Sequence, residues 1–233
     1  MHEALNACFQ ETIEQFNRSS GMARFWAGEL DKRHYAHLMR EVFHHSRENP
    51  QIQAAATAYF RGTQREMVKG FLRHAVSEIG HDQLALNDAF AAGLDVSTVP
   101  QQFPLPATTA LVAFAYYQIY HRDVVGYLGY LYFLEFMPTG FGAEYMQRLA
   151  HMGVTPDAMT FLQDHSTVDL GHNKLMHGYV DKLVTSDEKL AAVTYAMRVT
   201  GHLYSGMVAE AFLDADRALA EDSQVREAAY VAG

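Results

Sequence analysis

Two eight-residue stretches of the sequence carry side chains of the types that bind metal ions. They are HAVSEIGH, residues 74–81, and HSTVDLGH, residues 165–172. Each begins with a histidine, places a carboxylate four residues later and ends in a Gly-His pair. The residue counts of the chain predict well under one copy of this spacing by chance, so two copies indicate a shared role.

On an α-helix, positions i, i+4 and i+7 fall within an arc of about 60°. Each stretch is therefore predicted to direct a carboxylate and two histidines to one side of its helix. Imidazole nitrogens and carboxylate oxygens together suit iron, manganese or zinc better than calcium. The alternative is that they form ordinary histidine–carboxylate pairs along a helix. The two triplets are His74, Glu78 and His81, and His165, Asp169 and His172.

Two further acidic residues lie in helical patterns. Glu135 belongs to YLGYLYFLEFM, whose other residues are typical of a protein core. An ionised carboxylate in a core is costly unless it is paired or binds a cation, so Glu135 is either a ligand or the partner of an arginine or histidine from another helix. Glu41 and His44 form a carboxylate-x-x-histidine pair in REVFHH, for which an exposed histidine-rich face is the alternative.

Taken in chain order, these residues follow the plan of helical bundles that hold two carboxylate-bridged metal ions. In that plan one helix gives a carboxylate and the next gives a Glu-x-x-His pair, and the arrangement is repeated. The sequence therefore predicts two iron ions, cycling between the ferrous and ferric states, with O2 as co-substrate. The predicted ligands are Glu41, Glu78, His81, Glu135, Asp169 and His172, with His165 as an additional nitrogen ligand.

The elements that position these residues are predicted to be helices throughout. Apolar residues recur at three- and four-residue spacing, and no alternating strand pattern is present. This pattern predicts an all-α, single-domain bundle of about seven helices over residues 1–233, with 221–233 as a tail that can fray. The expected helices cover about 3–18, 31–48, 51–62, 63–93, 107–153 with a kink or break at Pro138, 156–184 and 186–220.

The composition argues against several classes of protein. With 27 acidic and 18 basic residues and no basic cluster, the chain has a net charge of -9, and no nucleic-acid partner is expected. Cys8 is the only cysteine, which excludes an internal disulfide and fits a reducing cytoplasm. We expect no signal peptide and no membrane partner, because the longest apolar run, 124–134, is too short to span a bilayer.

The chain resembles the heme-oxygenase-like diiron oxidases and oxygenases over about residues 30–205. The motifs that carry the resemblance are His165-x3-Asp169-x2-His172, Glu78-x2-His81 and the aromatic-rich YLYFLE that ends at Glu135. The resemblance implies the helical fold shared with heme oxygenase, thiaminase II and pyrroloquinoline quinone synthase. It also implies a non-heme diiron enzyme that uses O2 to oxidise a small amine, amino-acid or fatty-acid-like substrate, often in natural-product biosynthesis.

The resemblance leaves some ligands open. The family uses a glutamate in its first helix, which corresponds here to Glu41, with His44 or His45 as alternatives. His74 stands where some relatives have a further carboxylate ligand, so it either binds metal or lines the pocket. Residues 136–150 contain no lysine, so we do not expect the family activity that makes 4-aminobenzoate from the enzyme's own side chains.

The aromatic-rich segment 111–133 is a candidate lining for a substrate cavity, with Arg40 or Arg122 as a partner for a substrate carboxylate. No glycine-rich nucleotide motif is present, so reducing equivalents are expected from an external electron donor or from the substrate. A homodimer is the assembly that we assume.

Three other functions are compatible with parts of the sequence. A thiaminase II-type hydrolase, or a cofactor-independent enzyme of the same fold, would act without iron; the hydrolase needs a nucleophilic cysteine, for which only Cys8 is available. A heme oxygenase would use His44 as its axial ligand, with Gly126 and Gly129 beside the porphyrin. A metal-storage bundle would bind ions without turning over a substrate.

Overall fold

The computed structural model describes the backbone of residues 1–232 and the side chains of residues 1–166, 173–225 and 227. All regular secondary structure in this part of the chain is helical, as the sequence predicts, but it is divided into more helices than the seven expected. The α-helices are α1 (His2–Asn17), α2 (Ser20–Ala27), α3 (Lys32–Ser46), α4 (Asn49–Thr57), α5 (Val68–Ser77), α6 (His81–Ala91), α7 (Pro106–His121), α8 (Tyr127–His151), α9 (Thr160–Leu183) and α10 (Asp187–Ala232). Short 3-10 turns are η1 (Gly62–Met67), η2 (Val99–Gln101), η3 (Val124–Gly126) and η4 (Pro156–Ala158).

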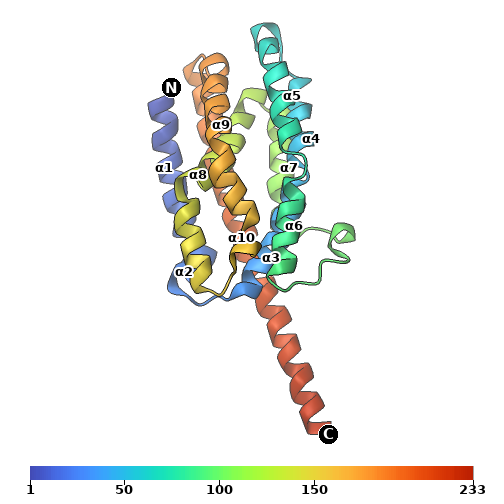
Figure 1. Ribbon diagram of the computed structural model, residues 1–233. Coiled ribbons are helices and arrows are strands. Elements are labelled where there is room, and N and C mark those ends of the chain that lie inside the picture. Colours follow the sequence, from blue (N-terminus) through green and yellow to red (C-terminus); the bar gives the residue numbers. More distant parts are fainter. Residues whose placement is uncertain (233) are drawn as a thin grey trace.

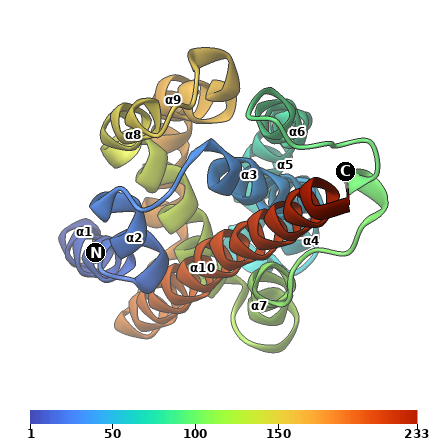
Figure 2. The ribbon, with the colours of Figure 1, turned by 90° about the horizontal axis from the view of Figure 1, so that it is seen from below.

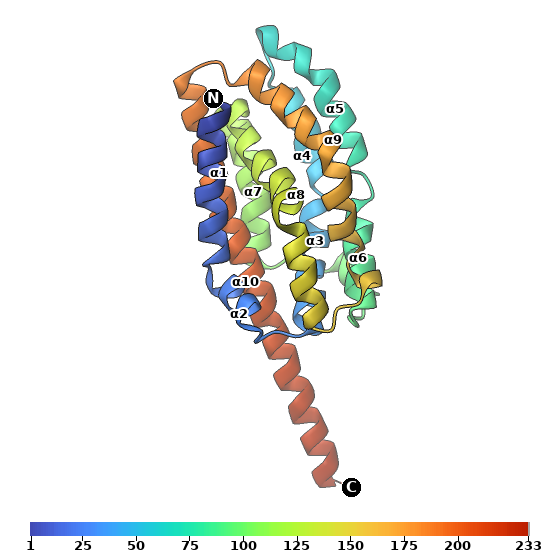
Figure 3. The same cartoon turned by 60° about the vertical axis from the view of Figure 1, so that its left-hand side comes forward.

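The helices form an elongated bundle (Figure 1). Seen along the bundle, α8 and α9 lie on one side, while α3, α5 and α6 lie on the other (Figure 2). The helix α10 packs against α1, α3, α7 and α8, and its last part projects beyond the other helices (Figure 3). This helix runs to Ala232, whereas the sequence predicted an end near Ala220. No helix in the described part of the chain is long and apolar enough to cross a membrane.

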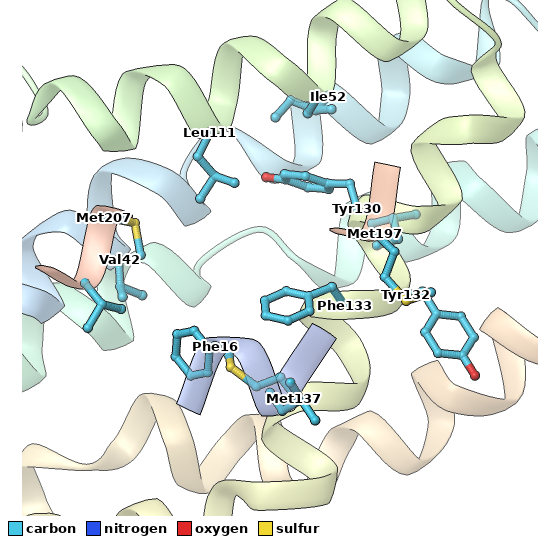
Figure 4. Close-up of a cluster of buried hydrophobic side chains, with 14 of the residues drawn as sticks. Phe16, Val42, Ile52, Leu111, Tyr130, Tyr132, Phe133, Met137, Met197 and Met207 are labelled. Carbon is cyan, nitrogen blue, oxygen red and sulfur yellow. The ribbon is translucent and has the colours of Figure 1, made fainter. Parts of the chain in front are cut away.

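The core is built around the first half of α8, whose side chains are buried on every side. Figure 4 shows Tyr130 and Phe133 of this helix among apolar side chains from α1, α3, α4, α7 and α10. Aromatic rings pack edge to face here, for example Phe16 on Phe133 with ring centroids 6.2 Å apart. A helix that is apolar all round is stable only in such a position. Glu135 follows directly in the same helix and is thereby held inside the bundle.

Gly129 sets the distance between α8 and α10. A Cβ atom at this position would lie 2.1 Å from the carbonyl oxygen of Val193 and 2.6 Å from the amide nitrogen of Met197. Both atoms belong to the backbone of α10, which cannot move aside without disturbing the helix. The two longest helices of the core therefore depend on a residue without a side chain.

Several helix ends follow the sequence signals. The side chain of Asp31 accepts hydrogen bonds from the amides of Arg33 and His34 and caps α3, as predicted. The gap between the first two predicted helices contains the short helix α2. Asn49-Pro50 lies in the first turn of α4, where proline is favoured. The start of the helix predicted over 63–93 lies in the 3-10 turn η1.

Two long predicted helices are each divided in two. The expected helix over 63–93 ends at Ser77, and Gly80 takes a left-handed conformation, with φ of 102°, before α6 begins at His81. The expected helix over 107–153 is interrupted at Arg122 and Asp123, whose side chain caps η3. Pro138, where a kink or break was expected, lies inside α8, which continues through it. The break between α5 and α6 bears on the candidate site, because it separates Glu78 from His81.

Substituting Gly129 tests the close contact of α8 with α10. Gly129→Ala should lower the free energy of unfolding by about 2–3 kcal/mol, because the added methyl group collides with backbone atoms. Urea denaturation followed by circular dichroism measures this change. Gly140→Ala is the matched control, since Gly140 lies in the same helix and an added Cβ would meet nothing within 4 Å. It should raise stability by up to about 1 kcal/mol; equal destabilisation by both variants would contradict the packing argument.

Candidate metal centre

Two overlapping groups of metal-ligating side chains lie inside the bundle. One contains Glu78, His81 and His165, and the other contains His74, Glu78 and Glu135. Within each group the candidate ligand atoms all lie within 4.8 Å of one another. Glu78 belongs to both groups, so that its two carboxylate oxygens can serve neighbouring positions. The residues come from the end of α5, the start of α6, the middle of α8 and the first half of α9.

The turn between α5 and α6 brings Glu78 and His81 together. Glu78 follows the last residue of α5, and the left-handed Gly80 turns the chain so that His81 opens α6. Nδ1 of His81 then lies 3.2 Å from Oε2 of Glu78. Their spacing predicts both residues on one face of a continuous helix; the two residues do meet, but through a turn rather than through helical periodicity.

The second group surrounds a pair of buried carboxylates. Nε2 of His74 lies 3.1 Å from Oε1 of Glu135 and 3.7 Å from Oε1 of Glu78. Both glutamates are only 7% exposed, and His74 is 1% exposed. Burying two carboxylates so close together is unfavourable unless positive charge compensates them. A divalent or trivalent ion provides such compensation, and this set of nitrogen and oxygen donors is one that iron accepts.

The imidazole rings are oriented by partners outside the two groups. His165 donates from Nδ1 to the carbonyl oxygen of Phe161, 2.8 Å away, so that Nε2 is available to a metal ion. Nδ1 of His74 lies 2.7 Å from Nε2 of Gln53. Donation by the Gln53 amide leaves the ring proton of His74 on Nε2, which faces Glu135. Gln53 therefore orients the His74 ring toward the two glutamates.

The start of α9 is fixed by a buried acid of α6. The carboxylate of Asp88 accepts hydrogen bonds from the amides of Thr160 and Phe161, at 3.0 and 2.9 Å, and from the Thr160 hydroxyl at 2.6 Å. Burial raises the pKa of Asp88, and these hydrogen bonds oppose that rise. Because Phe161 in turn accepts from His165, Asp88 positions His165 relative to α6 and its first residue, His81.

A cavity of about 40 Å³ adjoins the candidate ligands. Glu78, Glu135 and His165 line it together with His45 of α3. A second cavity of about 80 Å³ lies next to it and is lined by apolar residues and tyrosines of α1, α2, α3, α8, α9 and α10. The residues common to both linings are Val42, Met137, Pro138, Phe161 and Tyr204.

Glu41 does not join these groups and is placed elsewhere, contrary to the sequence prediction. Its carboxylate is completely buried and accepts hydrogen bonds from the Leu105 amide at 2.9 Å and from the Thr108 hydroxyl at 2.5 Å. Arg40 pairs with its other oxygen at 2.9 Å. Glu41 thus fastens α3 to the start of α7.

His45, named as an alternative to Glu41, lines the cavity beside Glu78 and Glu135. Tyr130 donates to Asn49 at 3.0 Å and accepts from Nε2 of His45 at 2.6 Å. His44 lines a different cavity beside α7. The side chains of Asp169 and His172 lie outside the described residues, although the backbone of α9 is helical through both.

The structure also places the other residues to which the sequence assigned a role. Arg40 is engaged by Glu41 and by Asp214, and Arg122 lines a separate surface cavity, so neither reaches the ligand groups. The packing of Gly129 against α10 leaves no room for a porphyrin at that position. Three residues that orient or adjoin the ligands were missed by the sequence argument: Asp88, Gln53, and Asp164, which lies 3.5 Å from His81.

This arrangement is that of a helical bundle with an internal histidine–carboxylate centre beside an apolar cavity, which is typical of metal-dependent redox proteins. Residues 36–205 match the sequence profile of a family described as iron-containing redox enzymes. The match covers most of the chain, and the protein belongs to this family. No curated protein matches the sequence.

Solved structures place the protein in the heme-oxygenase-like fold. A domain of unknown function with a heme oxygenase-like fold from Shewanella denitrificans OS217 is 23% identical, with a TM-score of 0.81 over 91% of this chain and 90% of that one. A TenA homolog from Pseudomonas syringae pv. tomato DC3000 is 12% identical, with a TM-score of 0.74 over 91% and 92%. A TenA family transcription regulator from Silicibacter sp. TM1040 is 14% identical, with a TM-score of 0.65 over 90% and 96%.

At these identities the likeness concerns the fold alone. Cys8, the only candidate nucleophile for a hydrolase of this fold, is buried in α1, where its thiol donates to the carbonyl oxygen of Thr194 at 3.6 Å. Burial raises the pKa of this thiol, which makes it a poorer nucleophile. It lines neither of the two cavities next to Glu135.

The burial of His45 predicts a dependence of stability on pH. Burial lowers its pKa to about 4, from about 6.5 in an unfolded chain. As the pH falls, the unfolded chain takes up a proton on His45 before the folded protein does. The contribution of neutral His45 to stability is therefore fully present above about pH 6.5 and is lost as the pH falls toward 4. Between pH 7 and pH 5 the metal-free protein should lose about 2 kcal/mol more than the His45→Gln variant, measured by urea denaturation. Equal losses in the two proteins would show that His45 is not buried in its neutral form.

Proposed function

We propose that the protein is a non-heme oxidase or oxygenase that uses O2 at a centre of two iron ions. The observation that carries this proposal is the sharing of Glu78 by two adjacent ligand groups in a buried position. The iron-containing redox family supports iron as the metal. The number of ions and the use of O2 are parts of the proposal.

The proposed ligands combine the structure with the sequence repeat. Glu78, His81, His165, His74 and Glu135 are those whose side chains lie in the two groups. Asp169 and His172 are added from the sequence repeat. They follow His165 by four and seven residues in α9, the same spacing at which Glu78 and His81 follow His74 in the sequence. Glu41 is left out of the proposed set.

Bound iron would supply the electrons that reduce O2 while a nearby substrate is oxidised. The protein contributes a site that excludes bulk water and holds its donors in place. Tyr204 lines both cavities, and burial raises its pKa to about 12, so its hydroxyl stays protonated at neutral pH. It can therefore donate a hydrogen bond to a substrate at the boundary between the two cavities.

The substrate is proposed to have an apolar body. The larger cavity has no charged residue in its lining, and the hydroxyls of two of its tyrosines are already engaged, Tyr35 by Asp88 and Tyr145 by Asn17. A hydrocarbon chain or ring is therefore favoured in this cavity, with the group to be oxidised pointing toward Glu78 and Glu135. Among the substrate classes of the family, a fatty-acid-like or alkylamine compound fits this lining better than a small polar amino acid.

Iron binding distinguishes Glu78 from Glu41. The Glu78→Ala variant should lose iron from both positions and bind it at least about 100-fold more weakly, because it removes a ligand common to both groups. Anaerobic ferrous iron titration, followed by Mössbauer spectroscopy, measures stoichiometry and coordination. Glu41→Gln, the control, should retain the wild-type stoichiometry of about two irons per chain, although its lost ion pair with Arg40 lowers stability. Full iron binding by Glu78→Ala would refute the proposed centre.

Filling the junction of the two cavities tests the substrate class. Val42 lines both cavities from α3, so Val42→Phe should close the passage between them without touching a proposed ligand. Decanoate and decylamine should raise the melting temperature of the wild-type protein and of Val42→Ala, but not of Val42→Phe. Iron content, measured in parallel, should be unchanged in both variants. Equal shifts by butyrate and decanoate would argue against an apolar chamber.

A further inference from the structure

We propose that the outer face of α5 is the docking surface for an acidic one-electron carrier protein. This inference rests on the proposed iron function, which requires reducing equivalents from outside the chain. The helix α5 lies at the edge of the bundle, with one side toward solvent (Figures 1 and 3). Its inner side carries His74 and leads to Glu78, so the surface and the candidate centre share one short segment.

The outer face has an apolar centre. Leu72, Val76 and Ile79 are 42%, 66% and 68% exposed. Leu72 and Val76 lie about 40° apart around the helix, so they form one patch. Ile79 continues it at the turn, between Glu78 and Gly80. Three large apolar side chains turned together toward solvent indicate a surface that another molecule covers.

Cations surround this apolar centre. Arg65, Lys69 and Arg73 are all exposed and recur every four residues, which places Lys69 and Arg73 on the same outward side as Val76. None of the three forms an ion pair with any side chain that the structure describes. Glu66 is the one acid among them in the sequence. These cations alternate with apolar residues in the sequence and become neighbours only on the helix surface.

The charge of this face is opposite to that of the chain as a whole. The protein carries a net charge of -9, so an acidic partner is repelled by most of its surface and attracted here. Such a field orients an incoming acidic protein and raises its rate of association. A small apolar centre with a charged rim is typical of transient encounters such as those of electron-transfer proteins.

The position of the face suits the transfer of electrons. His74 and Glu78 project from the opposite side of the same segment, so a carrier docked on α5 is separated from them by about the 10–12 Å width of one helix. In each encounter the carrier would be oxidised by one electron, which reduces one ferric ion of the centre to the ferrous state. Two encounters then restore a pair of ferrous ions.

The test compares two double charge reversals with equal net charge. Binding of an oxidised plant-type two-iron ferredoxin, an acidic carrier, is measured by isothermal titration calorimetry on the iron-loaded protein and its variants. Lys69→Glu/Arg73→Glu should weaken binding about tenfold or more, and added salt should weaken wild-type binding as well. The control, Lys32→Glu/Arg217→Glu, alters two exposed cations outside α5 and should change binding less than twofold.

A kinetic measurement separates this inference from the iron centre itself. Reduction of the ferric protein by dithionite should be unaffected by Lys69→Glu/Arg73→Glu, whereas reduction by ferredoxin should slow in proportion to the lost affinity. If dithionite reduces no bound iron in any variant, the proposed function is refuted. The docking proposal is then tested by calorimetry alone.

Three outcomes would overturn the docking proposal. The first is equal binding of ferredoxin by both double variants. The second is wild-type self-association, seen by analytical ultracentrifugation, that Val76→Lys abolishes, because a second copy would then occupy the face. The third is binding to vesicles of anionic phosphatidylglycerol that Lys69→Glu/Arg73→Glu abolishes while ferredoxin binding persists, since the face would then serve a lipid surface.

Discussion

The structure depends on the burial of two neighbouring carboxylates, Glu78 and Glu135, inside a bundle whose interior is mostly apolar. Ionised groups in such a place are tolerated only where positive charge or hydrogen bonds compensate them. Histidines of α5, α6 and α9 converge on them, and each of those histidines is oriented by a further contact, as His165 is by Phe161. Burying these carboxylates in the core is therefore unfavourable in free energy. The contacts of the surrounding residues offset this cost and keep the side chains of the site in position.

The sequence predicted the helical class of the fold and most of the residues that meet in the candidate centre. It could do so because helical periodicity and buried acids leave a local pattern, as in HAVSEIGH and around Glu135. The route by which His81 reaches Glu78 could not be predicted, since a long helical pattern hid the turn at Gly80. Whether a glycine continues a helix or reverses direction depends on tertiary packing.

The error at Glu41 has a different cause. A carboxylate-x-x-histidine pair on a helix has the same local spacing whether it binds metal or holds a neighbouring segment. The long-range partners of Glu41 are Thr108 and the amide of Leu105, which lie more than sixty residues away at the start of α7. Asp88 escaped notice for the same reason, because its partners at the start of α9 lie about seventy residues further along the chain. Long-range hydrogen bonds of single side chains leave no signal in spacing.

The left-handed turn at Gly80 divides the candidate ligands between two helices. Asp88 ties the start of α9, which carries His165, to α6, which begins with His81, whereas Glu78 follows the last residue of α5. The helix α5 also packs on α9, where the rings of Phe71 and Tyr179 lie with centroids 4.3 Å apart. Ions bound between these helices would therefore be enclosed by donors whose spacing is set jointly by the packing of α5, α6 and α9.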